Sequence, residues 1–157
     1  SYGHPVPYIN GTTQPYGVGA RANVIKTNFT DEQDEYILDL KPAYYNIEGL
    51  EKLTRKFVYS RAENETLLIE DQFVFISPAD METAITIYGN WKISDNGNLE
   101  ITGEKAKVAV QITVPQNTTY TIVADDIEEY GRKFTRLGIR LNDKIEEGFI
   151  RLFLKVI

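Results

Sequence analysis

The sequence lacks cysteine, and histidine, methionine and tryptophan each occur once in its 157 residues. Without cysteine the chain forms no disulfide and no thiolate metal site, which leaves its cellular compartment open. A Ser-His-Asp triad would have to use His4, and no Gly-x-Ser-x-Gly motif accompanies it. A zinc site needs three or four protein ligands. Because His4 has no second histidine to pair with, the residues alone predict no complete metal site.

Basic charge and long apolar runs are also scarce. The 17 lysines and arginines are dispersed and are outnumbered by 23 acidic residues, which gives a net charge of -6. Because no basic stripe is available to neutralise phosphates, we expect no nucleic-acid partner. The sequence holds no apolar run of about 18 residues, so we expect no membrane span, and we see no signal peptide within these residues.

Alternation of apolar and polar residues is abundant. In "KVAVQITV" (107–114), Val108, Val110, Ile112 and Val114 share one face, which is the pattern of a half-buried strand in the interior of a sheet. The same alternation predicts further strands within residues 22–29, 35–40, 53–60, 65–75, 81–88, 98–103, 119–124, 133–141 and 149–157.

Strands and turns that recur about every ten residues favour antiparallel sheets over alternating strands and helices. The fold class that we predict is therefore all-β, an antiparallel β-sandwich of about ten or more strands. We assign residues 21–157 to this single domain. Residues 1–20 hold four glycines and three prolines, and we expect them to form an extended lead-in that lies against another surface.

The connecting segments carry turn chemistry. Asn96-Gly97 is the strongest hairpin signal in the chain. We expect one helical turn over residues 46–53, and residues 125–132 ("DDIEEYGR") as either a loop or a turn of helix. The acidic clusters at 31–35 and 125–129 match no EF-hand spacing, so solvated hairpin ends are favoured over calcium sites.

Five segments in this order resemble a known family: "GHPVPYINGTTQ", "DLKPAYYNIEGLEKLTRKFVYSR", "TLLIEDQFVF", "METAITI" and "RLGIRL". Together they are similar to the C-terminal β-sandwich of the heparinase II/III-like polysaccharide lyases. The resemblance covers essentially the whole chain. Its most specific parts are the Gly-His-Pro-Val-Pro lead-in, with Asn10-Gly11 and Gln14, and the block around "LKPAYY".

The resemblance implies a partner domain and a reaction. Such enzymes pair an N-terminal (α/α) toroid with this sandwich and cleave acidic, uronate-containing polysaccharides such as glycosaminoglycans or alginate by β-elimination. We expect the toroid to lie upstream of a boundary just before His4, and the chain alone to be catalytically incomplete, with unknown catalytic residues. The resemblance also implies a bacterial source and a periplasmic or secreted location. Four lead-in residues would bind the acidic polysaccharide: Tyr8, Asn10, Gln14 and Tyr16.

The resemblance further implies one divalent, zinc-like metal in the full-length protein, and none in this chain by itself. Its ligands would be a His and an Asp upstream of the present residues, and His4 as the third ligand. Several family members have Asn after this histidine, whereas Pro5 follows it here. Proline fixes the backbone and removes an N–H that could bond a substrate or a loop.

A different class of function stays open at this point, a stand-alone carbohydrate-binding or cell-surface interaction module. Such a module needs aromatic rings on an exposed sheet face, because the face of a ring stacks on a sugar. Trp91 is the first candidate for this platform, and Tyr44, Tyr45, Tyr8 and Tyr16 are the other aromatic candidates.

Overall fold

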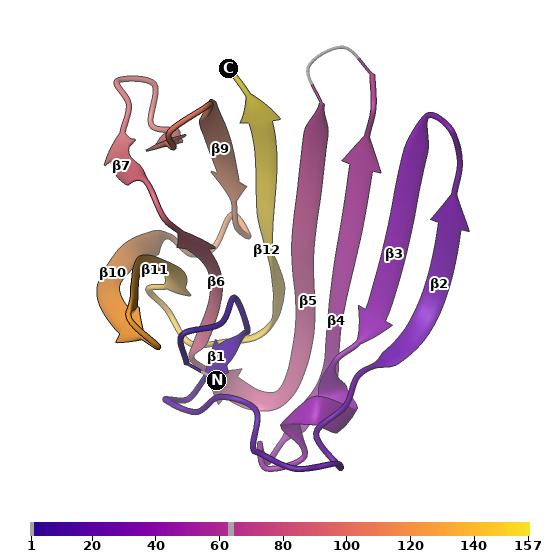
Figure 1. Ribbon diagram of the computed structural model, residues 1–157. Helices are drawn as coiled ribbons and strands as arrows, with labels where there is room; N and C mark the ends of the chain where they lie inside the picture. Colours follow the sequence, from indigo (N-terminus) through magenta and orange to yellow (C-terminus); the bar gives the residue numbers. More distant parts are fainter. Residues whose placement is uncertain (1, 63–64) are drawn as a thin grey trace.

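The computed structural model describes residues 2–62 and 65–157, which form two antiparallel sheets (Figure 1). The strands of the smaller sheet are, in spatial order, β1 (Tyr8–Ile9), β6 (Met81–Ile87), β11 (Arg132–Leu141) and β10 (Tyr120–Glu129). Those of the larger sheet are β2 (Asn23–Phe29), β3 (Gln33–Asp39), β4 (Leu50–Ser60), β5 (Thr66–Ala79), β12 (Ile145–Val156), β9 (Lys107–Thr113), β8 (Leu99–Thr102) and β7 (Asn90–Ile93). The predicted all-β antiparallel sandwich is therefore confirmed. Among the described residues, no helix has the length and apolar character needed to cross a membrane.

All ten predicted strands are present, whereas the short strands β1 and β7 were missed. The prediction of a helical turn over 46–53 is wrong: the turn, η1, spans Lys41–Tyr44, where a proline opens it, and β4 begins at Leu50. A β-bulge between Leu50 and Lys52 explains the error. Because the bulge inserts one residue, Leu50 and Leu53 are both buried although they are three positions apart, and this spacing imitates a helix.

The two hairpin ends can be compared with their predictions. Asn96-Gly97 does form a turn, between β7 and β8, with Gly97 at a positive φ of 81° and its N–H donating to the Ser94 carbonyl. The acidic run that begins at Asp125 belongs to β10, and the turn after it is confined to Tyr130 and Gly131, which both have positive φ. The expectation of a loop or helical turn over 125–132 is thus corrected to a long strand with a tight hairpin.

The core lies between the two sheets, and the larger sheet contributes buried side chains both from the half that holds β12, β9 and β8 and from Leu53 and Phe73 of β4 and β5 in the other half. In β9 the predicted face is confirmed, because Val110 is fully buried and Ile112 is half-buried, whereas Gln111 and Thr113 are exposed. β9 lies between β12 and β8, so it is an interior strand as expected. Leu152, opposite Ile112 on β12, is also fully buried.

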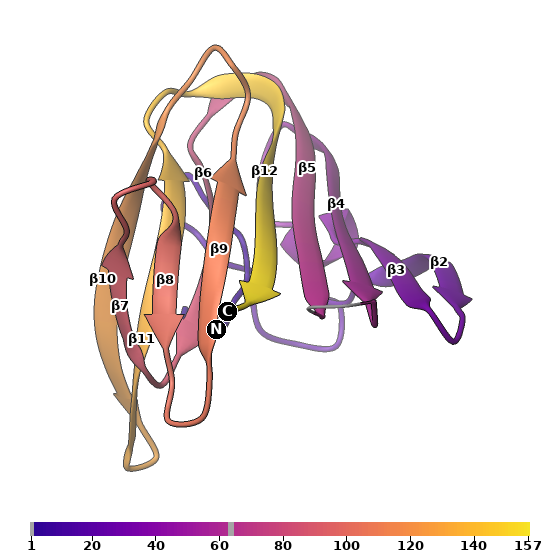
Figure 2. The same ribbon diagram turned by 90° about the horizontal axis from the view of Figure 1, so that it is seen from above.

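The other half of the larger sheet reaches beyond the smaller one (Figure 2). All seven residues of β2 are exposed, among them Val24 and Phe29. Pairing places Tyr36 of β3 opposite Phe57 of β4, which is itself opposite Ile69 of β5, so these half-buried side chains continue the core face outward. Apolar side chains therefore extend past the area that the smaller sheet covers.

A charged pair lies inside the sandwich. Arg55 of β4 donates two hydrogen bonds to the fully buried Asp71 of β5, from Nε and Nη2 at 2.7 Å each. The Thr83 hydroxyl of β6 donates to the same carboxylate at 2.5 Å, which links the two sheets. Burial alone would lower the pKa of Arg55, but the charge and hydrogen bonds of Asp71 outweigh it and raise that pKa. The Arg55 guanidinium is thus held by Asp71 inside the sandwich.

We expect Leu152→Ala to lower the free energy of unfolding by about 2–5 kcal/mol, because it removes a fully buried side chain from the core. Ile112→Ala on the same pair of strands should cost clearly less, since Ile112 is only half-buried. Chemical denaturation measures both values. Equal losses for the two variants would contradict the burial of the two side chains described here.

We expect Asp71→Ala to cost about 3–5 kcal/mol, because it leaves the Arg55 guanidinium buried without its counter-charge. The double variant Arg55→Met with Asp71→Leu should recover most of this loss, since it removes both charges while filling the space. Denaturation of the single and double variants tests the pair. A single-variant loss below about 1 kcal/mol would show that water reaches the site.

Candidate functional site

The N-terminal segment packs against the smaller sheet and closes one edge of it. Tyr8 and Ile9 form β1, which pairs antiparallel with Glu82 and Met81 of β6. A tight turn follows, in which Asn10 has a φ of 47° and Gly11 a φ of 74°. The segment that holds most of the predicted site residues is therefore anchored on the sandwich itself.

One side chain of β4 and one of η1 donate hydrogen bonds to the backbone of this segment. Arg55 Nη1 donates to the Pro5 carbonyl at 2.6 Å, while its other nitrogens bind Asp71. The Tyr44 hydroxyl donates to the Pro7 carbonyl at 2.8 Å. Burial is the main cause that raises the pKa of Tyr44, so this phenol stays protonated and remains a donor.

Tyr2 covers a second buried arginine. Its ring lies 4.4 Å from the Arg136 guanidinium, and its hydroxyl donates to Asp125 at 2.5 Å. Tyr2 also meets the Tyr8 ring edge-on, with centroids 5.3 Å apart. Burial, followed by the bond to Asp125, raises the pKa of Tyr2. The two tyrosines thereby contribute to the complete burial of Arg136.

Glu82 is shared by two arginines. Its carboxylate accepts from Arg136 Nη1 at 2.5 Å and from Arg140 Nε at 2.8 Å. Gly138 lies between the arginines on β11, and a Cβ there would come within 2.4 Å of Glu82 Oε1. Glycine is therefore required at this position for the three charged groups to meet. One carboxylate thus binds two guanidiniums.

A pocket of about 340 Å³ opens beside this cluster and is lined by Tyr8, Gly11, Asp80, Met81, Glu82 and Arg140. We call it the Tyr8–Arg140 pocket. The Arg140 side chain is 44% exposed, so its guanidinium is accessible from solvent. Asp80 at the rim is paired with Lys144 at 3.3 Å. A guanidinium beside a tyrosine hydroxyl is suited to bind a carboxylate or a sugar hydroxyl.

The four predicted substrate residues fall into two groups. Tyr8 lines the pocket, and Asn10 lies next to it, where its side-chain carbonyl accepts the Asp80 N–H at 2.9 Å. Gln14 is half-buried and Tyr16 is 88% exposed, and neither belongs to the residues that line the pocket. The structure thus brings Tyr8 and Asn10 to one place and leaves Gln14 and Tyr16 farther along the segment.

The residues present do not supply a complete metal site. His4 is exposed, and within residues 2–62 and 65–157 no group of three or more His, Asp or Glu side chains is placed to hold an ion. A metal at His4 would need ligands from outside these residues. In the acidic cluster at 31–35, the Glu35 carboxylate forms ion pairs with Lys26 and Lys56, and these two bonds lower the pKa of Glu35.

Trp91, the first candidate for a sugar-stacking platform, is half-buried and packs against the core. Tyr44 is buried as well. Tyr88, in contrast, is exposed and lines a pocket, although the sequence did not indicate it as a candidate for sugar stacking.

The charged residues Arg55, Asp71, Glu82, Arg136 and Arg140 were also missed from the sequence. For the Arg55–Asp71 pair the sequence did contain a signal. Asp71 lies two positions from both Ile69 and Phe73, so the alternation along the strand places it on the core side with them. A charged residue in such a position must be paired inside the fold. For Arg136 and Glu82 no such signal exists, since their face of the sheet is buried by the distant residues Tyr2 and Tyr8.

Comparisons with known proteins agree with this fold. No family model and no curated protein sequence matches the chain. Among solved structures, heparan sulfate lyase HepC from Pedobacter heparinus matches with a TM-score of 0.70 and 11% identity over 98% of this chain and 23% of that chain. Heparinase III matches with a TM-score of 0.66 and 10% identity over 97% of this chain and 23% of that chain.

The chain thus spans about a quarter of the length of the lyases that it matches. At 8–11% identity the shared property is the fold. With two antiparallel sheets matched along nearly its whole length, the chain has the fold of the C-terminal β-sandwich of heparinase III lyases, as its sequence resemblance predicts.

Proposed function

We propose that this chain is the C-terminal β-sandwich portion of a polysaccharide lyase that cleaves uronate-containing acidic polysaccharides by β-elimination. The observation that carries the proposal is the match with heparinase III lyases over 97–98% of the chain. The chain corresponds to 23% of those enzymes, so we propose that it is incomplete as a catalyst and that an upstream (α/α) toroid supplies the rest of the active site.

The Tyr8–Arg140 pocket is the part of the sandwich that we assign to substrate binding. β-Elimination requires that the charge of the uronate carboxylate is neutralised, that a base removes the C5 proton and that an acid protonates the leaving oxygen. The accessible Arg140 guanidinium is suited to the first of these tasks. Because the Asn10 carbonyl is bonded to Asp80, Asn10 would offer its NH2 group to the sugar.

Gln14 and Tyr16 belong to the same segment, and we propose that they bind sugar units farther along the polymer. Tyr16 is 88% exposed, and the face of a tyrosine ring is suited to stack on a sugar. His4 would complete a metal site only together with upstream residues, and no catalytic step is assigned to it. As the sequence resemblance implies, we also propose that the protein is bacterial and is secreted or periplasmic.

The uncovered half of the larger sheet is the surface that we assign to the upstream domain. From Ile69, which packs against the core, Phe57 and Tyr36 continue the core face toward β2, where Phe29 is exposed. Contiguous apolar surface of this kind marks an interaction site. A toroid packed on this face would bury these side chains.

The lyase assignment is tested by comparing this chain with its upstream-extended form on heparan sulfate, alginate and other uronate polymers. Absorbance of the unsaturated product should rise with the extended protein and stay flat with the chain alone. In the extended protein, Arg140→Gln should lower kcat/KM by about 10–150-fold, because a hydrogen bond to a charged group is worth about 1.5–3 kcal/mol.

Lys92→Gln, a change of an exposed side chain on β7, is the matched control and should leave the rate unchanged. Silence of both protein forms on every polymer, or activity of the chain alone, would overturn the assignment.

The surface assigned to the upstream domain has its own test. We expect the isolated chain to bind an apolar dye and to self-associate, as measured by light scattering, because the large apolar side chains Val24 and Phe29 at the β2 edge of this half-sheet are exposed. Phe29→Ser should reduce dye binding. A clean monomer that binds no dye would contradict the assignment.

A further inference from the structure

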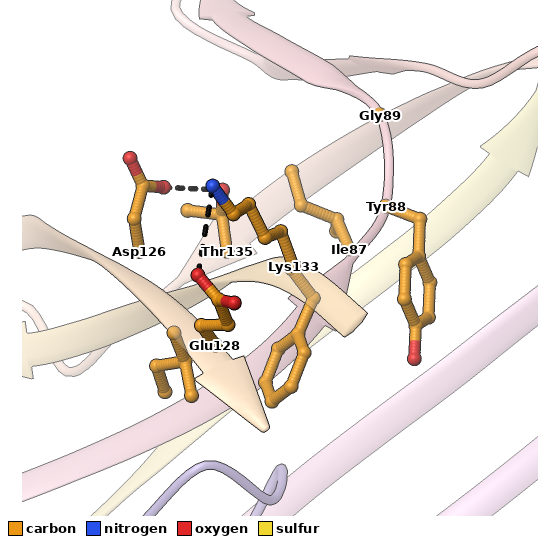
Figure 3. Close-up of a pocket in the computed structure, with 9 residues that line it drawn as sticks. Ile87, Tyr88, Gly89, Asp126, Glu128, Lys133 and Thr135 are labelled. Atoms are coloured by element: carbon orange, nitrogen blue, oxygen red, sulfur yellow. Dashed lines mark hydrogen bonds and ion pairs between the residues drawn. The ribbon is translucent and has the colours of Figure 1, made fainter. Parts of the chain in front are cut away.

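A second pocket lies where the smaller sheet loses a strand. β6 ends at Ile87, and the chain crosses through Tyr88 and Gly89 to β7 in the other sheet. Thr135 of β11 pairs with Ile87, where β6 ends. Residues 132–134 of β11 lie beyond this pair, and among the described strands they pair only with β10. The space left beside it is a pocket of about 390 Å³ (Figure 3). We call it the Tyr88 notch, and residues 87–89, 126–128 and 133–135 line it.

Tyr88 separates this notch from a second hollow of about 590 Å³. Ile87, Tyr88 and Gly89 line both spaces, and the β8–β9 turn, Gly103–Ala106, lines the far side of the second. Gly89 fixes the position of this divider, because a Cβ there would lie 2.1 Å from the Thr102 carbonyl oxygen. Both volumes fall in the range of small-ligand sites.

The notch has an aromatic wall. Tyr88 is 75% exposed, and its ring centroid lies 5.9 Å from that of Phe134 at an angle of 54°. The exposed ring of Tyr88 is therefore an apolar surface that a ligand in the notch can cover. The apolar C–H face of a pyranose ring suits such a surface, whereas its edge needs hydrogen bonds.

The opposite wall supplies those hydrogen bonds. The Thr135 hydroxyl donates to Asp126 Oδ1 at 2.7 Å, and Lys133 Nζ lies 3.5 Å from Glu128 Oε2. The side chains of Lys133 and Glu128 are 82% and 62% exposed, so both heads can turn to a ligand. Carboxylates accept and an ammonium donates, which matches the dual character of sugar hydroxyls. Figure 3 shows these groups converging on one side of the notch.

The charge of the notch selects among sugars. Two carboxylates, those of Asp126 and Glu128, face one ammonium, that of Lys133, in the lining. This excess of negative charge repels a polyanion. The notch also shares no lining residue with the Tyr8–Arg140 pocket.

We propose that the Tyr88 notch binds a neutral pyranose sugar, with one ring stacked on Tyr88. The hydroxyls of that ring would bond to Asp126, Lys133 and Thr135. The inference does not depend on the proposed lyase function, because it concerns another site and is tested on this chain by itself.

The test is a titration of the chain with cellohexaose, xylohexaose, mannohexaose and maltohexaose, followed by calorimetry and by amide NMR shifts, with an alginate hexasaccharide as the acidic comparison. At least one neutral sugar should bind at millimolar concentration or below and shift the amides of residues 87–89 and 126–135. Tyr88→Ala should weaken that binding by about 5–150-fold, as for other stacking rings.

Two variants control the interpretation. Tyr88→Phe retains the ring and should retain the affinity, and Tyr45→Ala removes an exposed tyrosine elsewhere and should change nothing. Circular dichroism verifies that each variant is folded. The proposal is overturned if none of the four neutral sugars binds, if Tyr88→Ala binds as well as the parent chain, if Tyr88→Phe loses affinity like Tyr88→Ala, or if the acidic hexasaccharide binds more tightly through the same amides.

Discussion

The buried ion pair of Arg55 and Asp71 is the interaction on which the arrangement of this protein depends. Two charges removed from water must be fully paired and hydrogen-bonded. Thr83 of the smaller sheet and the Pro5 carbonyl of the N-terminal segment complete that pairing. The contact between the sheets and the placement of the segment are therefore parts of one network. Together with the pairing of β1 and β6, this network holds the segment that contributes Tyr8 to the Tyr8–Arg140 pocket.

Much of the fold follows from alternation in the sequence, since each residue of a strand points to the opposite face from its neighbour. Val110 and Leu152 lie inside, as their patterns predict. The β-bulge at Leu50 led to the wrong prediction of a helical turn over 46–53, because the inserted residue changes the spacing of buried residues from that of a strand to that of a helix. Two-residue strands such as β1 are too short to show any period.

The candidate sites were less predictable than the fold. Tyr8 was identified by resemblance, but the residues that give its pocket a charge come from β6 and β11, and only the register between them places Glu82 opposite Arg140. Tyr88 was missed for a related reason. Its importance arises from the departure of β6 from the sheet, and no pattern within "METAITIY" shows where that strand leaves its neighbour.

The long-distance pairing of the N-terminal segment has a consequence for the order of folding. β1 pairs with β6, and Tyr2 contacts Arg136 and Asp125, which follow it by most of the chain length. Contacts between residues so far apart in sequence form slowly, because the chain entropy lost in closing the loop precedes any gain. The partners of the segment on β6, β10 and β11 must themselves be assembled first. Residues 2–9 should therefore be among the last to settle, and Arg136 stays open to water until they do.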